Sequence, residues 1–156
     1  MTDTTPLTAD EMLLWASLGR IVHALPRVLE DDMSRATGLS MTDFATLLVL
    51  DQAPDRRLRM SELATATGLT PSRITRVVDA LRAHGLVDKE RHGADARGNV
   101  AVLTADGLAR LEAAQPAHLA IARRRVLEHV PPDLVPVLAA ALKTITDATT
   151  GPLRAG

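Results

Sequence analysis

The chain has 156 residues, 46% of them hydrophobic, which is enough for one domain with a buried core; Trp15 and Phe44 are its only aromatic residues, so the core must be aliphatic. Cysteine is absent, which excludes disulfides, thiolate metal sites and cysteine-based peroxide sensing. The net charge is −1, and neither a signal peptide nor an apolar run near the ~18 residues that cross a bilayer is found, so we expect a cytoplasmic protein without membrane contact.

The first predicted helix runs from Thr8 to Thr37. Thr8 and Glu11 have the spacing of a capping box, and Gly38 is placed to end the helix. Apolar residues recur between these limits with the helical period: Leu14, Leu18, Ile21, Val22, Leu25, Val28, Leu29 and Met33. Pro26 interrupts this pattern and is expected to kink or divide the helix.

Three further elements are predicted before residue 70. Ser40 caps a second helix that ends at Gln52, where Ala53, Pro54 and Asp55 break it. A short strand is expected from Arg57 to Met60. Ser61 is expected to cap a third helix that ends at Gly68.

Thr70 and Pro71 open a fourth helix, because a cap residue followed by proline is typical of a helix start. Four apolar residues on this helix share the spacing of one buried stripe: Ile74, Val77, Val78 and Leu81. The opposite face is polar and carries Ser72, Arg76, Asp79 and Ala83, flanked by Arg73 and Thr75. His84 and Gly85 end the helix.

Two short strands, Leu86 to Arg91 and Asn99 to Leu103, are predicted around an exposed turn of residues 92–98. Asp95 is expected to bond turn amides or Arg97, so that Arg97 projects toward a DNA minor groove. Thr104 caps a fifth helix that runs to about Val130 and is bent by Pro116, and a sixth helix follows from Leu134 to Ala148.

Residues 61–104 therefore read as a helix-turn-helix followed by a two-stranded wing, an arrangement that places one helix in a DNA groove. The charge distribution agrees with this interpretation. From Arg56 to Arg97, nine Arg and Lys stand against five Asp and Glu, whereas the remaining residues hold nine against fourteen. A basic segment is thus attached to an acidic scaffold, and a dimer would double the basic face.

Two stretches of this segment resemble the MarR family of bacterial regulators. One is Asp95-x-Arg97 followed by Val100, Val102, Leu103 and Thr104, which is similar to the family's wing signature. The other is the run from Ser72 to Val87, which looks like the family's recognition helix and its exit. The chain departs from the pattern at Ala96, where many members carry the first of two arginines.

The resemblance implies a mainly α, winged-helix (α+β) fold with six helices, a two- to three-stranded β-wing and an intertwined homodimer. Residues 1–39 and 105–150 would form the helical dimerisation region, and residues 40–104 the DNA-binding lobe. It further implies a pseudo-palindromic operator of double-stranded DNA, and a repressor released by a small anionic or aromatic effector.

The candidate DNA contacts are the exposed polar residues of the helix-turn-helix and the wing: Ser61, Thr70, Pro71, Ser72, Arg73, Thr75, Arg76, Arg91, Asp95 and Arg97. Asp79 is expected to pair with Arg76 or Arg82 rather than to read a base. The candidate ligand-pocket residues are Trp15, His23, Arg27 and Phe44, although for Trp15 and Phe44 the sequence favours core or dimer packing.

Other charged groups admit simpler interpretations. Residues 30–32, Glu-Asp-Asp, are expected to be a solvated helix end, and residues 123–125, three arginines, to pair with acids across a dimer or to face water. Arg56, Arg57 and Arg59 could reach the DNA backbone or remain solvated.

The sequence also bears on two other function classes. The five histidines are dispersed without metal-ligand spacing, and no nucleophile motif is present, so we expect no metal, no cofactor and no enzyme activity. The alternative to a DNA-binding regulator is a winged-helix protein–protein adaptor without DNA binding, which Ala96 and the negative net charge favour.

Overall fold

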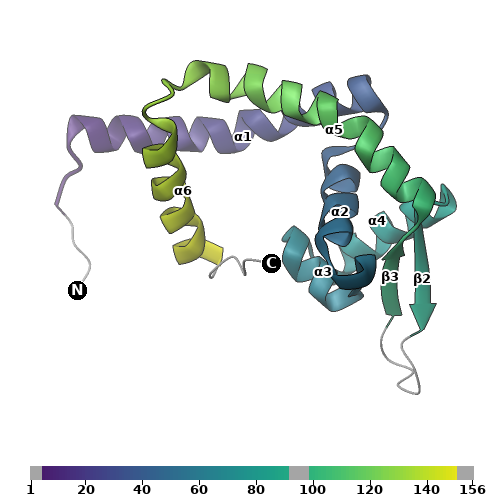
Figure 1. Ribbon diagram of the computed structural model, residues 1–156. Helices are drawn as coiled ribbons and strands as arrows, with labels where there is room; N and C mark the ends of the chain where they lie inside the picture. Colours follow the sequence, from purple (N-terminus) through teal and green to yellow (C-terminus); the bar gives the residue numbers. More distant parts are fainter. Residues whose placement is uncertain (1–4, 92–98, 151–156) are drawn as a thin grey trace.

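The computed structural model describes residues 5–91 and 99–150, and its fold is mainly helical (Figure 1). The elements in chain order are α1 (Ala9–Thr37), α2 (Met41–Gln52), η1 (Pro54–Arg56), β1 (Arg57–Arg59), α3 (Met60–Thr67), α4 (Pro71–Ala83), β2 (Val87–Arg91), β3 (Asn99–Leu103), α5 (Ala105–Arg125), η2 (Leu127–His129) and α6 (Val135–Thr150). Six α-helices and a three-stranded sheet confirm the expected winged-helix class.

The helices form an arch (Figure 1). Helices α1 and α5 pack against each other along its top, the lobe formed by α2 to β3 lies at one end, and α6 descends at the other. The sheet of the lobe is antiparallel with the order β1-β3-β2, and it pairs Leu58 with Ala101 and Lys89 with Ala101. The wing strands β2 and β3 extend away from α1 (Figure 1).

One aliphatic core joins the lobe to the scaffold. Its fully buried members in the lobe include Leu47, Leu63 and Val78, and those contributed by the scaffold include Met33 and Leu111. Phe44 is also buried in this core, where its ring stacks on that of His118 at a centroid distance of 4.4 Å. The prediction that Phe44 serves packing is thus confirmed.

Four of the five helix-capping residues that the sequence predicts do cap their helices. The Thr8 and Ser40 hydroxyls accept from the third residue of α1 and α2 in full capping boxes, and Thr70 and Thr104 cap α4 and α5. The prediction for Ser61 was wrong, because α3 begins at Met60. There the Glu62 carboxylate accepts from the Arg59 backbone N–H at 3.0 Å, so β1 runs into the helix without a hydroxyl cap.

The two internal prolines do not divide their helices. α1 continues through Pro26, which lies on an exposed side where water can bond the carbonyl that proline leaves without a donor. α5 continues through Pro116 and changes direction along its length in Figure 1, as predicted. α5 ends at Arg125 and not near Val130, since Val126 leaves the helical region at φ −132° and the turn η2 follows.

Candidate nucleic-acid interface

The turn between α3 and α4 sets the direction of the recognition helix. Gly68 adopts a left-handed conformation with φ 68°, which glycine accepts without the Cβ strain of other residues. Its N–H and that of Leu69 donate to the last carbonyls of α3. Two residues later the Thr70 hydroxyl accepts from the Arg73 N–H at 3.3 Å, and Pro71 occupies the first helical position.

Helix α4 buries one face and exposes the other. Ile74, Val78 and Leu81 are buried in the lobe core. The predicted DNA contacts on this helix and at its cap are all exposed: Thr70, Pro71, Ser72, Arg73, Thr75 and Arg76. Because the inward residues anchor the helix, the first two turns of its outer face are held rigidly toward solvent.

The hydroxyls on this outer face are ordered locally. The Thr75 hydroxyl donates to the Pro71 carbonyl at 2.8 Å, and the Thr70 and Ser72 hydroxyl oxygens lie 3.3 Å apart. Arg73 and Arg76, by contrast, make no side-chain hydrogen bond or ion pair with the described part of the chain. Both guanidinium groups are therefore available to an external anion such as a phosphate.

Asp79 does not pair with Arg76 or Arg82, contrary to the prediction. Its Oδ1 atom lies 3.1 Å from the Lys89 Nζ atom, and the pair joins α4 to β2. The helical spacing suggested a local partner, whereas the sheet register brings Lys89 beneath the helix. The pair fixes the wing to α4 and leaves the charges of the two arginines uncompensated within the helix.

The basic edge of the sheet is partly neutralised. Arg57 pairs with Glu90 across the central strand, and Arg56 pairs with Asp51 at 3.0 Å. Arg91 is the last residue of β2, and its backbone pairs with that of Asn99 in β3. The predicted wing contacts Asp95 and Arg97 lie in residues 92–98, outside the described residues, so their roles stay predictions.

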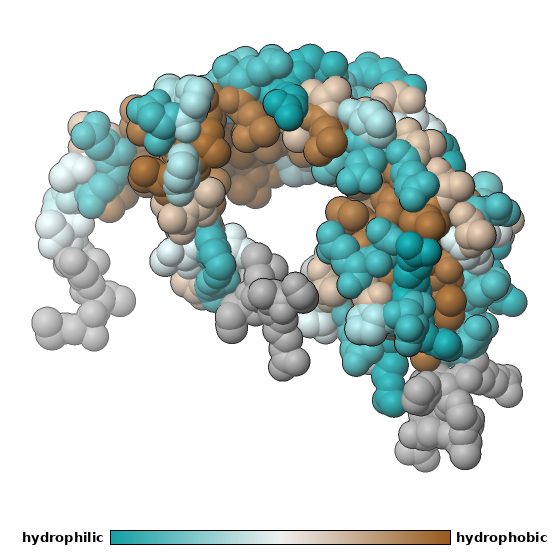
Figure 2. Space-filling view, in the orientation of Figure 1, coloured by the Kyte–Doolittle hydropathy of each residue, from teal (hydrophilic) through white to brown (hydrophobic). Residues whose placement is uncertain are grey.

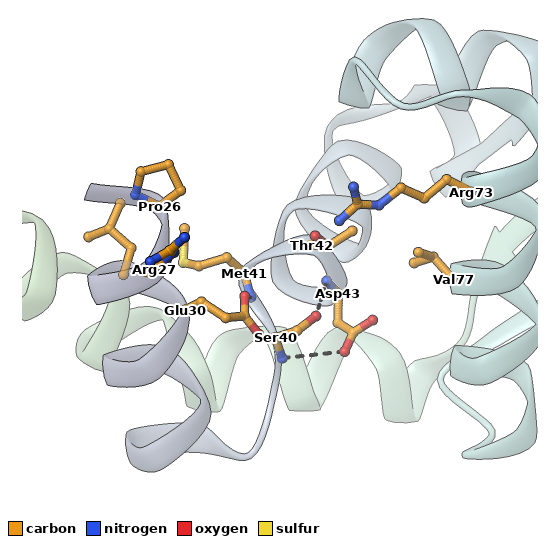
Figure 3. A pocket seen from close by; sticks show the side chains of 10 residues that line it. Pro26, Arg27, Glu30, Ser40, Met41, Thr42, Asp43, Arg73 and Val77 are labelled. Carbon is orange, nitrogen blue, oxygen red and sulfur yellow. Dashed lines mark hydrogen bonds between the residues drawn. The ribbon is translucent and has the colours of Figure 1, made fainter. Parts of the chain in front are cut away.

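A cavity of about 680 Å³ lies between α1, the start of α2 and α4 (Figure 3). Its apolar lining comes from Pro26, Leu29, Met41 and Val77, and its charged lining from Arg27, Glu30, Asp43 and Arg73. Of the four residues predicted for a ligand pocket, only Arg27 lines this one. Trp15 and His23 lie exposed on α1, and Phe44 is in the core.

The two acids of the cavity are already engaged with the start of α2. Glu30 Oε2 accepts from the Met41 N–H at 2.9 Å, and Asp43 Oδ2 accepts from the Ser40 N–H at 3.3 Å. Arg27 and Arg73 face the cavity from opposite walls in Figure 3, and neither forms a side-chain bond within the described residues. The cavity thus offers two unpaired cations over an apolar floor.

Asp32 holds a charge cluster that the sequence interpretation missed. Its carboxylate is buried and accepts from Arg125 at 2.6 Å, from Arg124 at 3.0 Å and from Arg35 at 2.9 Å. These bonds, first those from Arg125 and Arg124, hold the pKa of Asp32 well below its usual value. The predictions of a solvated acid and of arginines paired across a dimer or facing water were therefore wrong for these residues.

Other kinds of site find no support in the described ranges 5–91 and 99–150. No cluster of three or more His, Asp or Glu side chains there could hold a metal ion. None of the helices there is both long and apolar enough to span a bilayer.

A helix-turn-helix whose second helix exposes a polar, basic face beside a three-stranded wing defines a winged-helix DNA-binding protein. Comparison with known proteins agrees. The profile of the MarR family matches residues 37–98. The chain is 35% identical over 112 residues to the HTH-type transcriptional repressor YetL of Bacillus subtilis (strain 168), an alignment that covers 72% of this chain and 66% of YetL.

Solved structures extend the likeness to nearly the whole chain. Sco3205, a MarR family regulator from Streptomyces coelicolor solved in complex with DNA, is 29% identical with a TM-score of 0.86 over 99% of this chain and 100% of that one. AbsC, from the same organism, is 34% identical with a TM-score of 0.83 over 95% and 99%. The chain belongs to the MarR family, and is a DNA-binding transcriptional regulator and not an enzyme.

Proposed function

We propose that this regulator is a homodimeric repressor that binds a pseudo-palindromic operator and leaves it when a small amphipathic anion binds. The observation that carries the DNA-binding part is the outer face of α4. Ser72, Arg73, Thr75 and Arg76 are exposed on a helix whose other face is anchored in the core. Short hydroxyls and unpaired guanidinium groups are the side chains that contact phosphates and base edges.

The wing supplies the second contact in this proposal. Strands β2 and β3 pair in register from Val87–Leu103 to Arg91–Asn99, and the segment between them, residues 92–98, includes Asp95 and Arg97. An arginine between the two strands of a wing can enter the narrow minor groove beside the major-groove site of a recognition helix. Arg91 and Arg97 then hold the lobe on the DNA backbone.

Dimerisation is supported by the apolar surface of α1 and α6. Large hydrophobic side chains are exposed in a single chain on both helices, among them Leu14, Trp15, Val22, Leu138 and Leu142. Figure 2 shows hydrophobic residues gathered where α1 and α6 overlap in this view, whereas hydrophilic residues prevail on the visible face of the lobe. Exposed apolar side chains of this number and size are typical of a protein–protein interface, and they support an obligate homodimer.

The cavity between α1, α2 and α4 supports a ligand-responsive regulator. Its volume is within the range of small-molecule sites, and its lining is mostly apolar, as in such sites. The guanidinium groups of Arg27 and Arg73 suit an anionic group on the ligand. CouR from Rhodococcus jostii RHA1, which shares the fold at 23% identity, was solved bound to p-coumaroyl-CoA. A ligand here would touch the scaffold and the recognition helix together, and can favour one lobe position over another.

The test uses the full chain and the DNA upstream of its own gene. Light scattering should give twice the mass of one chain, and a gel shift should show a specific complex with a Kd on the order of 10 nM that weakens steeply with salt. Footprinting should protect two half-sites about one DNA turn, ~34–36 Å, apart. The absence of any shift at low salt would favour the adaptor alternative.

A further inference from the structure

Helix α4 carries an acidic residue on the face that is proposed to contact DNA. Asp79 is the only Asp or Glu in the sequence of α4, and its side chain is 53% exposed. It follows Ser72 by seven residues and Arg76 by three, which places it about 20° and about 60° from these two residues around the helix axis. The outer face of α4 therefore includes a carboxylate, a group that phosphates repel.

The Asp79 carboxylate is close enough to the predicted DNA contacts for its charge to matter. Along the axis of α4, Asp79 lies about 4.5 Å beyond Arg76. This separation is shorter than the Debye length of about 8 Å at physiological ionic strength, so salt would not screen the carboxylate from a phosphate bound by Arg76. An uncompensated Asp79 would thus oppose DNA binding.

Lys89 of β2 compensates this charge. Its Nζ atom lies 3.1 Å from the Asp79 Oδ1 atom, although the Lys89 side chain is only 18% exposed. Side chains alternate along a strand, so Lys89 shares a face of β2 with Val87, which is fully buried. The carbon stem of Lys89 is therefore covered, while its ammonium group reaches Asp79 at the surface.

We propose that Lys89 is a positioning residue for operator binding, because its ion pair holds the Asp79 carboxylate toward β2 and neutralises it. This inference rests on the proposed function, since it assumes that the outer face of α4 contacts the DNA. Lys89 acts through Asp79 and does not itself touch the DNA. Exposed ion pairs contribute little to folding, and Asp79 is half-exposed, so the pair affects DNA binding more than unfolding.

The experiment measures operator affinity of the full chain by fluorescence anisotropy. Lys89→Met removes the charge and keeps the length of the side chain. We expect this variant to bind the operator roughly tenfold more weakly, because the Asp79 carboxylate is then uncompensated beside the phosphates. Lys89→Arg keeps the charge, and should bind the operator as the wild type does.

Asp79→Asn tests the carboxylate by itself. The amide oxygen of asparagine can still accept from the Lys89 ammonium group, while the negative charge is removed. We expect this variant to bind the operator at least as tightly as the wild type. Weaker binding would show that Asp79 has a favourable role at the DNA and would overturn the proposal, whether or not Lys89→Met folds.

The double variant Asp79→Asn/Lys89→Met separates compensation from direct contact. With neither charge present, its operator affinity should return to within about threefold of the wild type, so the two substitutions are strongly non-additive. If Lys89 bound a phosphate itself, or if it were needed only for the fold of the lobe, the double variant would remain as weak as Lys89→Met. That result would overturn the proposal.

The matched control is the only other lysine of the chain, Lys143, which pairs with Asp147 on α6 outside the DNA-binding lobe. Lys143→Met removes a lysine–aspartate pair of the same kind, and should keep the wild-type operator affinity. Urea unfolding of each variant is measured in parallel. A free energy of unfolding equal to that of the wild type shows that a loss of affinity does not arise from unfolding.

The results distinguish failure of this inference from failure of the proposed function. A wild-type chain that does not bind operator DNA contradicts the proposed function itself. A wild-type chain that binds the operator, together with a folded Lys89→Met variant of equal affinity, overturns only the role of Lys89.

Discussion

Gly107 lies in the first turn of α5, where the helix crosses the segment that leads from α4 into β2. A Cβ at this position would lie 2.0 Å from the Leu86 carbonyl oxygen and 2.7 Å from Leu103 Cδ1. The Leu86 carbonyl also accepts from the Thr104 N–H at 3.2 Å, so it cannot move without loss of that bond. The close approach therefore joins the scaffold to the root of the wing.

We expect Gly107→Ala to lower the free energy of unfolding by about 3 kcal/mol, the upper part of the range for an overpacked site, because the obstacle is backbone. Urea unfolding followed by circular dichroism measures the change. The matched control is Gly19→Ala in α1, where an added Cβ meets nothing within 4 Å. Gly19→Ala should raise the free energy of unfolding by about 1 kcal/mol, because alanine has the higher helix propensity. If both variants changed the free energy of unfolding by the same amount, the close approach of Gly107 to Leu86 would not explain the loss.

Local signals in the sequence were sufficient wherever a residue's partner is three or four positions away. Thr8, Ser40, Thr70 and Thr104 cap the helices they were expected to cap, since the donor lies in the same turn. The strained turn before β1 was not predictable in this way. Asp55 and Arg56 both have positive φ, at 53° and 54°, without a glycine to indicate it.

Partners that only the tertiary fold brings together were missed. Asp32 and Arg125 are 93 positions apart, and they meet because α1 and α5 pack along the top of the arch. The sequence identified both as charges on helices, but it could not give the angle at which those helices cross. The same limitation applies to Arg73, whose place on α4 was predicted while its place in the cavity depends on α1 and α2.

The cluster around Asp32 connects the end of α1 to the last turn of α5. Because the arginines hold the pKa of Asp32 below its unfolded value, its contribution to stability is present above about pH 4 and is lost as the pH falls through the folded pKa. Asp32→Asn removes the buried charge while it keeps the shape. The variant leaves Arg124 and Arg125 adjacent without their shared carboxylate.

We expect Asp32→Asn to lower the Tm at pH 7. The difference in Tm between the variant and the wild type should narrow as the pH falls below about 4, because the wild type then loses the stability that the ionised Asp32 contributes. Calorimetry across pH measures both effects. Asp31→Asn makes the same charge change at an exposed neighbour with no bond among the described residues, and should leave the Tm nearly unchanged at every pH. A pH-independent difference for Asp32→Asn would contradict the ionic explanation.

In the whole molecule, the arch leaves the apolar side of α6 uncovered by the other described residues. Leu138, Leu142 and Ile145 share one side of the helix at a spacing of four and three residues, and all three are more than 40% exposed. The dimer proposed above would cover this side with a second copy. The lobes would then bind two half-sites as one unit, so that operator affinity depends on α6 although α6 touches no DNA.

Leu142→Glu tests this dependence, because it introduces a charge at the centre of the apolar side, where burial without a partner is costly. We expect the variant to be monomeric in light scattering and to lose operator affinity by roughly 100-fold, since each half-site is then bound separately. Ala140→Glu, on the opposite side of α6, should remain dimeric and keep its affinity. A monomeric Leu142→Glu chain that binds the full operator with wild-type affinity would show that the two lobes do not act together.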